Sequence, residues 1–172
     1  TRWNCDWSSD VCSSDLPEGG TGRVDIWTVG WRMVEAHPVE GVGAGNFTTA
    51  SIHYLLEPGA ILRADFIVDQ PKVAHNTYLQ VLAELGLVGF LLFMTILLFS
   101  LVCAFKAHKV AAEAGDRELD IVARATVVAL LALYTAYFFV SRDYGKQLWL
   151  LLALCPVMLE IARKELRARQ AA

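Results

Sequence analysis

LGLVGFLLFMTILLFSLVCAF, residues 85–105, decides the fold of this chain, because the stretch contains no charged side chain. A helix of about 20 apolar residues is long enough to cross a hydrocarbon core of roughly 30 Å. The stretch therefore predicts a transmembrane helix.

Two further apolar runs follow toward the C-terminus. Residues 121–140 are interrupted only by Arg124, near their start, where a long side chain reaches the headgroups. Residues 144–161 contain Pro156, which removes one backbone hydrogen bond and favours a kink. The composition, 55% hydrophobic and 19% charged with a mean hydropathy of +0.41, is typical of a membrane protein. We predict a membrane region over residues 85–172, with three spans and a tail.

The distribution of basic residues predicts how these spans are oriented. The link between the second and third spans offers only Arg142 and Lys146. The other two flanks are richer in basic residues: Lys106, Lys109 and Arg117 after the first span, and Arg163, Lys164, Arg167 and Arg169 after the third. The positive-inside rule then places the C-terminus in the cytoplasm and residues 17–84 outside. An aromatic belt is expected at the outer interface, formed by Tyr134, Tyr137, Tyr144 and Trp149.

The external residues 17–84 read as a long ordered loop with two short helices. An amphipathic helix is predicted over residues 22–37, because apolar side chains lie at helical spacing at Val24, Trp27, Trp31 and Val34. Pro38 and the following glycines end it. A second helix begins near Ala74, with Asn76 or Thr77 as its N-cap, and Thr77 to Gln80 fit a capping box. This helix leads directly into the first span, so the fold class is an all-α integral membrane protein. Residues 48–72 carry no readable pattern beyond two turns.

The first sixteen residues are set aside. DWSSDVCSSDL, residues 6–16, resembles the translation of a sequencing-library adapter, so we expect residues 1–16 to be non-native and further native spans to precede residue 17. Outside this segment, Cys103 and Cys155 lie in apolar runs and indicate neither a disulfide nor a metal site. The small formal charge of −3 gives no reason to expect a nucleic-acid partner.

Several short motifs occur in a fixed order between the loop and the first span. They are Gly22-Arg23, Trp27, Pro38-x-x-Gly41-x-Gly43-x-Gly45-x-Phe47, Ala74-His75-Asn76-x-Tyr78-Leu79, Glu84, Gly86 and Gly89. Together they resemble the C-terminal signature of the O-antigen ligase and polymerase superfamily. The resemblance implies a membrane-embedded glycosyltransferase of the GT-C type, acting without a metal or cofactor in the cytoplasmic (inner) membrane of a bacterium. It also implies a polyprenyl-diphosphate-linked glycan as donor and a glycan, lipid or protein acceptor outside the cytoplasm.

The chemistry of such a transfer selects Arg23 as the first candidate for a catalytic residue. Cleaving a sugar from a diphosphate builds charge on the leaving phosphate, and arginine offers it a permanently charged fork of donors. Arg23 could instead be a solvated helix-start arginine that pairs with Asp25 or Glu84. Arg63 and Lys72 are secondary candidates for diphosphate contact, and each could equally be an ordinary loop charge.

His75 is the candidate for the base. The attacking acceptor hydroxyl must lose a proton, and histidine, with an ordinary pKa of about 6.5, suits that task near neutrality. His75 also lies where a helix begins, so the free N–H groups of the helix start could hold diphosphate oxygens beside it. The alternative is that His75 only assists the N-cap. Asn76 and Tyr78 could bind sugar or phosphate, although capping and interfacial anchoring explain them as well.

The glycines 41, 43 and 45 lack the G-x-G-x-x-G pattern of a nucleotide-binding loop. We interpret them as a tight turn that lets backbone approach lipid, glycan or a neighbouring helix.

The resulting hypothesis is a direct displacement at the anomeric carbon, with His75 activating the acceptor and Arg23 steadying the departing lipid diphosphate. Polymerisation and ligation differ only in the acceptor, and the sequence does not separate them. A non-catalytic transporter or scaffold with a glycan-binding external loop would require charged or polar residues facing a path within the spans. The first span has no charged residue and the second only Arg124, near its edge. A soluble helical bundle would require a polar face, which residues 85–105 lack.

Overall fold

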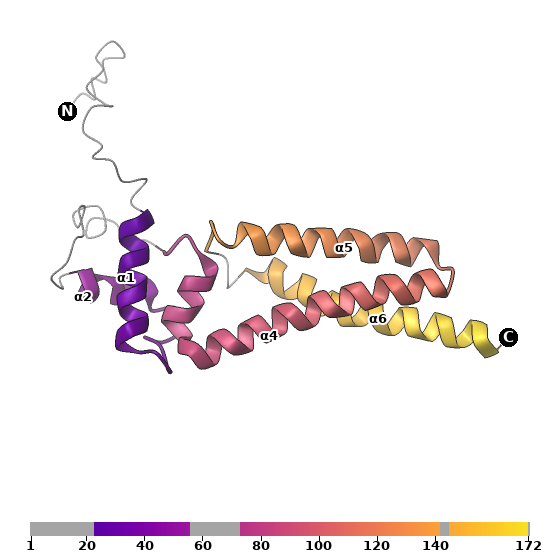
Figure 1. The fold of residues 1–172 in the computed structure, drawn as a ribbon, viewed down its shortest axis with the longest axis horizontal. Coiled ribbons are helices and arrows are strands. Elements are labelled where there is room, and N and C mark those ends of the chain that lie inside the picture. The colour runs from indigo at the N-terminus through magenta and orange to yellow at the C-terminus, as the bar shows by residue number, and fades with distance from the viewer. Residues whose placement is uncertain (1–22, 56–72, 142–144, 172) are drawn as a thin grey trace, which may run out of the picture.

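The structure, a computed structural model, describes residues 23–55, 73–141 and 145–171, and within these ranges every regular element is an α-helix. The helices are α1 (Arg23–Ala36), α2 (Phe47–Leu55), α4 (Thr77–Glu113), α5 (Arg117–Ala136) and α6 (Lys146–Ala171) (Figure 1). The all-α prediction is therefore confirmed for the described part of the chain. The segment 1–16 that was set aside lies outside the described residues.

The long part of α4 forms a bundle with α5 and α6, and α4 packs against both of the others (Figure 1). Small and apolar side chains fill the interior, among them Ala104 on α4, Leu130 on α5 and Cys155 on α6. Small residues in the interior let the helices approach closely, which is the usual way helices associate in a bilayer.

The outer surface of this bundle is apolar. Leu98 on α4 is 62% exposed, Val128 on α5 is 66% exposed and Leu150 on α6 is 75% exposed. By length and composition, α4 and α5 are apolar enough to cross a membrane, whereas in α6 the charges of Glu160 and Arg163 follow the apolar residues closely. Helices whose large apolar side chains point outward are typical of a lipid-facing surface.

The helices that carry the predicted spans have different bounds from those expected. The first span lies within α4, which continues to Glu113, and the third overlaps α6, which begins at Lys146 and continues to Ala171. The second is shifted: α5 begins at Arg117 and ends at Ala136, because residues 137–140 leave the helix and turn their carbonyl groups toward the start of α4.

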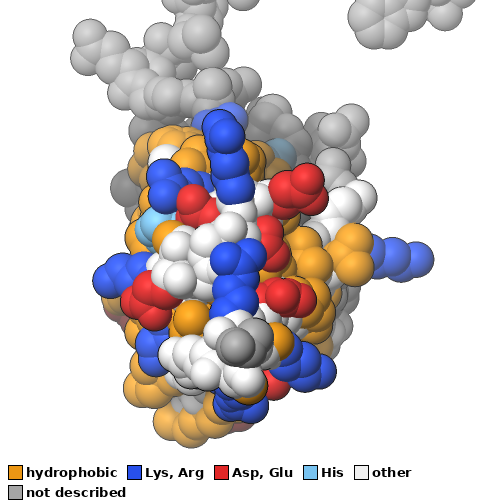
Figure 2. All heavy atoms as spheres, turned by 90° about the vertical axis from the view of Figure 1, so that its right-hand side faces the viewer, with side chains coloured by type: hydrophobic (Ala, Val, Ile, Leu, Met, Phe, Trp, Pro, Cys, Tyr) orange, Lys and Arg blue, Asp and Glu red, His pale blue; other side chains and the backbone are white. Residues whose placement is uncertain are grey.

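Charged side chains gather at the end of the bundle where α4, the α4–α5 turn and the C-terminal part of α6 lie, while apolar atoms surround its sides (Figure 2). Here Asp120 on α5 pairs with His108 on α4 at 2.8 Å and with Arg124 one turn along α5 at 2.8 Å. The turn itself contains Gly115, which has a positive φ of 66° and lies under the side chain of Arg169.

The predicted aromatic belt is only partly observed. Tyr134 and Tyr137 turn into the bundle, where Tyr137 is buried and the Tyr134 hydroxyl donates to the Leu97 carbonyl at 2.8 Å. Trp149 is exposed, and Tyr144 lies outside the described residues. Tyr134 turns inward because its phenolic hydroxyl gains a backbone acceptor there.

At the other end of the bundle, α1 lies across the helices, with α2 and the first turns of α4 beside it (Figure 1). This second core consists of Ile26, Val29, Met33, Phe47, Ala74 and Ala83. Gly30 of α1 allows the close packing, because a Cβ there would already lie 3.1 Å from Leu79 and 3.2 Å from Phe47. The helix predicted over residues 22–37 is confirmed as α1, but its predicted apolar face is only half right: Trp27 and Val34 pack against this core, whereas Val24 is 60% and Trp31 54% exposed. The buried face carries Ile26, Val29, Gly30 and Met33 instead, because α2 and α4 pack there.

A bend in α4 at Gly86, with φ 63° and ψ −169°, separates its first turns from its long part. The bend releases carbonyl groups from the helical pattern, and the loop after α1 supplies their donors: the Val42 amide bonds the Ala83 carbonyl at 2.9 Å and the Gly43 amide bonds the Glu84 carbonyl at 2.8 Å. The glycine-rich segment is thus a tight turn against a neighbouring helix, one of the interpretations made from the sequence.

Asn76 is the N-cap of α4, and its side-chain oxygen accepts from the Leu79 amide at 3.1 Å. The capping box predicted from Thr77 to Gln80 is wrong. Thr77 is already helical and its hydroxyl donates to the Val140 carbonyl, while the Gln80 amide group donates to the Glu84 carboxylate at 3.2 Å. Tertiary partners therefore replace the local bonds that the pattern predicted.

Candidate functional site

One hydrogen bond brings the neighbourhoods of Arg23 and His75 together. The indole N–H of Trp27 on α1 donates to the Ala74 carbonyl at 2.8 Å. Arg23 precedes Trp27 by about one helical turn, and His75 directly follows Ala74. The two candidates, 52 positions apart by their numbers, thus lie on either side of a direct contact between α1 and the start of α4.

Arg23 is exposed at the first residue of α1. Within the described ranges it forms no ion pair, so the pairing with Asp25 or Glu84 that the sequence allowed is not observed. Glu84 is buried and bonded to backbone amides instead. The guanidinium group is therefore available to an anion from solution.

His75 has an unusual backbone. Among the described residues it is the one residue other than glycine with a positive φ, at 49°. Its side chain is exposed, and its ring makes no hydrogen bond within the described residues, so it does not assist the N-cap. A side chain held in the left-handed region costs free energy, and such strain concentrates at functional sites.

The start of α4 offers few free donors for an anion. The Thr77 amide bonds the carbonyl groups of Tyr137 and Val140, at 2.9 and 3.1 Å. The Leu79 amide bonds Asn76, which leaves the Tyr78 amide as the one of these three without an acceptor in the described structure. Most of the backbone donors that were expected to hold diphosphate oxygens at this helix start are therefore already bonded within the protein.

The glycine-rich loop does not offer an anion cradle either. The Gly45 amide donates to Glu84 Oε2 at 2.7 Å, and the Phe47 amide donates to Glu84 Oε1 at 3.3 Å. A protein carboxylate thus already occupies the position at the start of α2 where a bound phosphate would be expected. Arg23 and His75 face solvent, and neither has a hydrogen-bond or ion-pair partner among the described residues.

The remaining candidates have structural partners or lie outside the described residues. Asn76 caps α4, and the Tyr78 hydroxyl donates to the Tyr134 carbonyl at 2.9 Å while its ring packs on Phe138 at 4.7 Å between centroids. Asn76 therefore has the capping role and Tyr78 the anchoring role that the sequence offered as alternatives. The binding of sugar or phosphate by these two residues stays a prediction. Arg63 and Lys72 fall in the range 56–72, outside the described residues.

A family model described as O-antigen ligase matches residues 9–94, which are 86 of the 172 residues. The chain belongs to the O-antigen ligase family. The match covers α1, the glycine-rich turn, α2, the His75 segment and the bend of α4, and it also includes the second half of the segment 1–16. No curated protein and no solved structure matches the chain.

Membership of the O-antigen ligase family and the two apolar helices agree with a membrane protein of polysaccharide assembly. Among the described residues of this ligase-family chain, no group of three or more His, Cys, Asp or Glu side chains is arranged to hold a metal ion. The candidate groups that the structure describes for this chemistry are the guanidinium of Arg23 and the imidazole of His75.

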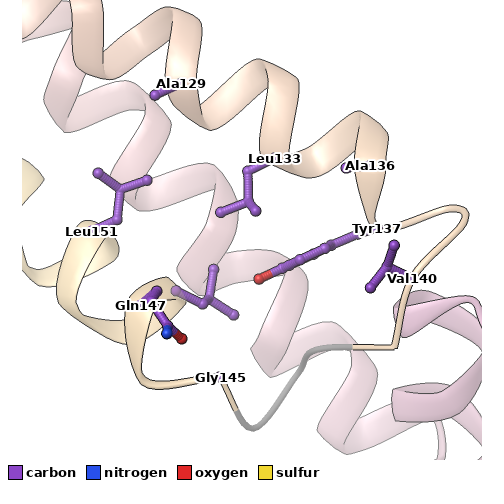
Figure 3. A pocket seen from close by; sticks show the side chains of 9 residues that line it. Ala129, Leu133, Ala136, Tyr137, Val140, Gly145, Gln147 and Leu151 are labelled. Carbon is purple, nitrogen blue, oxygen red and sulfur yellow. The ribbon is translucent and has the colours of Figure 1, made fainter.

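This O-antigen ligase-family chain also has two hollows in its bundle. A cavity of about 500 Å³ lies between α5 and α6 near the loop end, lined by apolar side chains with Tyr137 and Gln147 at its rim (Figure 3). A second one, of about 220 Å³, lies along α4 below the bend, with Glu84 and Trp149 in its lining. Neither of these two hollows is lined by Arg23 or His75, which are both exposed.

Glu84 is the residue whose importance the sequence did not reveal. It appears in the family signature, and Gln80 lies one turn earlier on the same helix face. Its principal partners, however, are backbone amides 37 and 39 positions away, and backbone amides leave no trace in a residue pattern.

Proposed function

We propose that this chain belongs to a glycosyltransferase that moves a glycan from a polyprenyl-diphosphate carrier to an acceptor in the assembly of surface polysaccharide. The observation that carries the proposal is the strained, solvent-facing His75, tied through Ala74 and Trp27 to the helix that bears Arg23. Membership of the O-antigen ligase family supports the same chemistry.

In the proposed reaction the oxygen of an acceptor hydroxyl attacks the anomeric carbon of the donor sugar. The bond from that carbon to the diphosphate oxygen breaks, and the electron pair leaves with the lipid diphosphate. The imidazole of His75 takes the hydroxyl proton and later releases it to water, while Arg23 lies beside the negative charge that builds on the diphosphate. Every atom and charge is accounted for without a metal.

The membrane placement is part of this proposal. We infer that α6 crosses the bilayer as a third span, because Leu150, Val157 and Ile161 point outward as lipid-facing residues do. The loop with Arg23 and His75 then faces the outside of a bacterial inner membrane, and the basic end of α6 faces the cytoplasm. This arrangement is that of a GT-C-type enzyme, whose donor lipid approaches from within the bilayer.

The test is glycan transfer by the complete gene product in membranes, with His75→Ala and Arg23→Ala. Loss of a general base costs about 10²- to 10⁴-fold in rate, so His75→Ala should lower the transfer rate by about a hundredfold or more. Arg23→Ala should lower it similarly, and Arg23→Lys should restore part of it because lysine keeps the charge and loses the fork.

Two matched variants control for unspecific effects. His53→Ala changes another exposed histidine, on α2, and Arg163→Ala changes an exposed arginine at the opposite end of the bundle. Both should transfer glycan at the unmodified rate. If His75→Ala or Arg23→Ala matched these controls, the proposed function would be wrong.

The choice between ligation and polymerisation depends on the acceptor and is read from the product. Ligation attaches a preformed glycan to a lipid core, surface polymer or protein, whereas polymerisation lengthens a lipid-linked chain. The length distribution of the product therefore assigns the reaction once transfer is measured.

A further inference from the structure

The loop layer, which consists of α1, α2, the loop between them and the first turns of α4, contains a buried carboxylate. Glu84 is 1% exposed, and its two oxygens accept from the amides of Gly45 and Phe47 and from the side chain of Gln80. Hydrogen bonds to a charged acceptor are about twice as strong as neutral ones. Glu84 therefore joins the first turns of α4 firmly to the start of α2.

From α2 the contacts continue to α1. Phe47 is fully buried, and its ring comes within 3.2 Å of the Cβ position of Gly30 on α1. No side chain on Gly30 separates the two helices, so the position of α1 depends directly on where Phe47 lies. Met33, one turn further along α1, belongs to the same buried cluster.

From α1 the contacts return to the candidate site. Trp27 donates to the Ala74 carbonyl, and Ala74 is itself buried in the cluster with Phe47. The residue after Ala74 is His75, held with a left-handed backbone. A path of direct contacts thus runs from the Glu84 carboxylate through α2 and α1 to His75, and it passes through the helix that carries Arg23.

We propose that Glu84 is a positioning residue for glycan transfer, which holds α1 and the His75 segment in the arrangement that the reaction needs; this inference rests on the function proposed above. Glu84 acts on the reaction only through His75 and Arg23. Misplacement of reacting groups by about 1 Å costs about 10²-fold in rate, so a residue outside the site can control the rate.

The test uses Glu84→Gln in the complete gene product. Glutamine keeps the shape but has one acceptor oxygen, and its NH₂ group faces an amide donor where the carboxylate accepted. We expect kcat to fall about tenfold or more with KM changed by less than about threefold, because alignment is lost and binding is not. Glu40→Gln, the same exchange at an exposed position of the same loop, should leave both constants unchanged.

A double-variant cycle separates positioning from general loss of structure. If Glu84 acts through His75 and Arg23, then Glu84→Gln should cause a smaller loss of rate in a protein that already carries His75→Ala than in the unmodified protein. In contrast, general damage to the fold would lower the transfer rates of the unmodified protein and of the His75→Ala protein by the same factor. Hydrogen exchange should also become faster at the amides of Gly45 and Phe47 in Glu84→Gln.

The outcomes decide between the proposals. The positioning role is overturned if Glu84→Gln has the same kcat as Glu40→Gln. It is also overturned if Glu84→Gln lowers the rate of the His75→Ala protein by as large a factor as it lowers the rate of the unmodified protein. Full transfer by His75→Ala or Arg23→Ala overturns the proposed function instead. If Glu84→Gln does not accumulate in membranes, Gln80→Leu, which removes one donor and keeps the carboxylate, should show the same pattern at smaller amplitude, and an unchanged kcat then overturns the inference.

Discussion

Gly41 and Gly86 meet where the loop crosses the bend of α4. Both have positive φ angles, 70° and 63°, and a Cβ on either would overlap the backbone of the other segment, at Glu84 for Gly41 and at Val39 for Gly86. We expect Gly41→Ala and Gly86→Ala each to lower the free energy of unfolding by about 2–4 kcal/mol, from backbone strain and steric overlap together. Thermal or denaturant unfolding in detergent micelles measures the change.

Gly45 supplies the control for these two substitutions. Its φ is also positive, at 73°, but no atom lies within 4 Å of its Cβ position. Gly45→Ala should therefore cost only the backbone term, about 1 kcal/mol. Equal stabilities for Gly41→Ala and Gly45→Ala would contradict the close backbone contact.

Trp27 offers a second prediction at the level of a single residue. Trp27→Phe keeps an aromatic ring in the core and removes the N–H that bonds the Ala74 carbonyl. We expect a loss of about 1 kcal/mol in the free energy of unfolding and a fall in the rate of glycan transfer, since the bond holds the segment beside His75. Trp31→Phe, on the same helix with a 54% exposed side chain, should change neither, and similar results for the two variants would refute the prediction.

At the scale of helices, the sequence predicted what depends on local pattern. Residues 85–105, without charge, and the spaced apolar residues of 22–37 correctly indicated α4 and α1. The sequence left the cap of α4 open between Asn76 and Thr77, because both residue types cap helices. Thr77 does not cap α4, because its hydroxyl donates to the carbonyl group of Val140, a contact between distant parts of the chain.

Other features of the helices were not predictable for the same reason. The bend at Gly86 needs donors from residues 42 and 43, and α2 gains its start from the Glu84 carboxylate. In the candidate site, Arg23 and His75 could be selected by chemistry and by motif order. The contact that joins their neighbourhoods could not, because it consists of a bond from Trp27 to a backbone carbonyl group and of the packing of α1 on α4.

The pairing of α4 with α5 gives the prediction at this scale. The Tyr134 hydroxyl on α5 donates to the Leu97 carbonyl on α4 at 2.8 Å. Tyr134→Phe should lower the free energy of unfolding in micelles by about 0.5–1 kcal/mol, the usual value for an interhelical bond in a membrane protein. Thr135→Val removes a hydroxyl that bonds within α5 itself, at the Leu131 carbonyl, and should have a smaller effect. A larger loss for Thr135→Val would argue against this contact.

For the whole molecule, α4 is the element that joins two different environments. Its first turns share a core with α1 and α2, and its long part shares a core with α5 and α6 (Figure 1). The polar loop layer and the charged turn lie at opposite ends of an apolar bundle (Figures 1 and 2). If the bundle crosses the bilayer, these two ends face different compartments.

Cysteine labelling tests this topology and the third span together. In the complete gene product, with any further native cysteine replaced by serine, Cys103 and Cys155 are buried and should not react. A cysteine at exposed Glu35 should then react in intact cells with a thiol reagent that does not cross the inner membrane.

A cysteine at exposed Gln170, near the end of α6, should react only after the cells are opened, because crossings by α4, α5 and α6 would place it on the other side of the membrane from the loop. A cysteine at Gln147, at the start of α6, should behave like the one at Glu35 and thereby show that the change of side occurs within α6. Labelling of Gln170→Cys in intact cells would mean that α6 returns to the outer side, and the three-span arrangement would have to be abandoned.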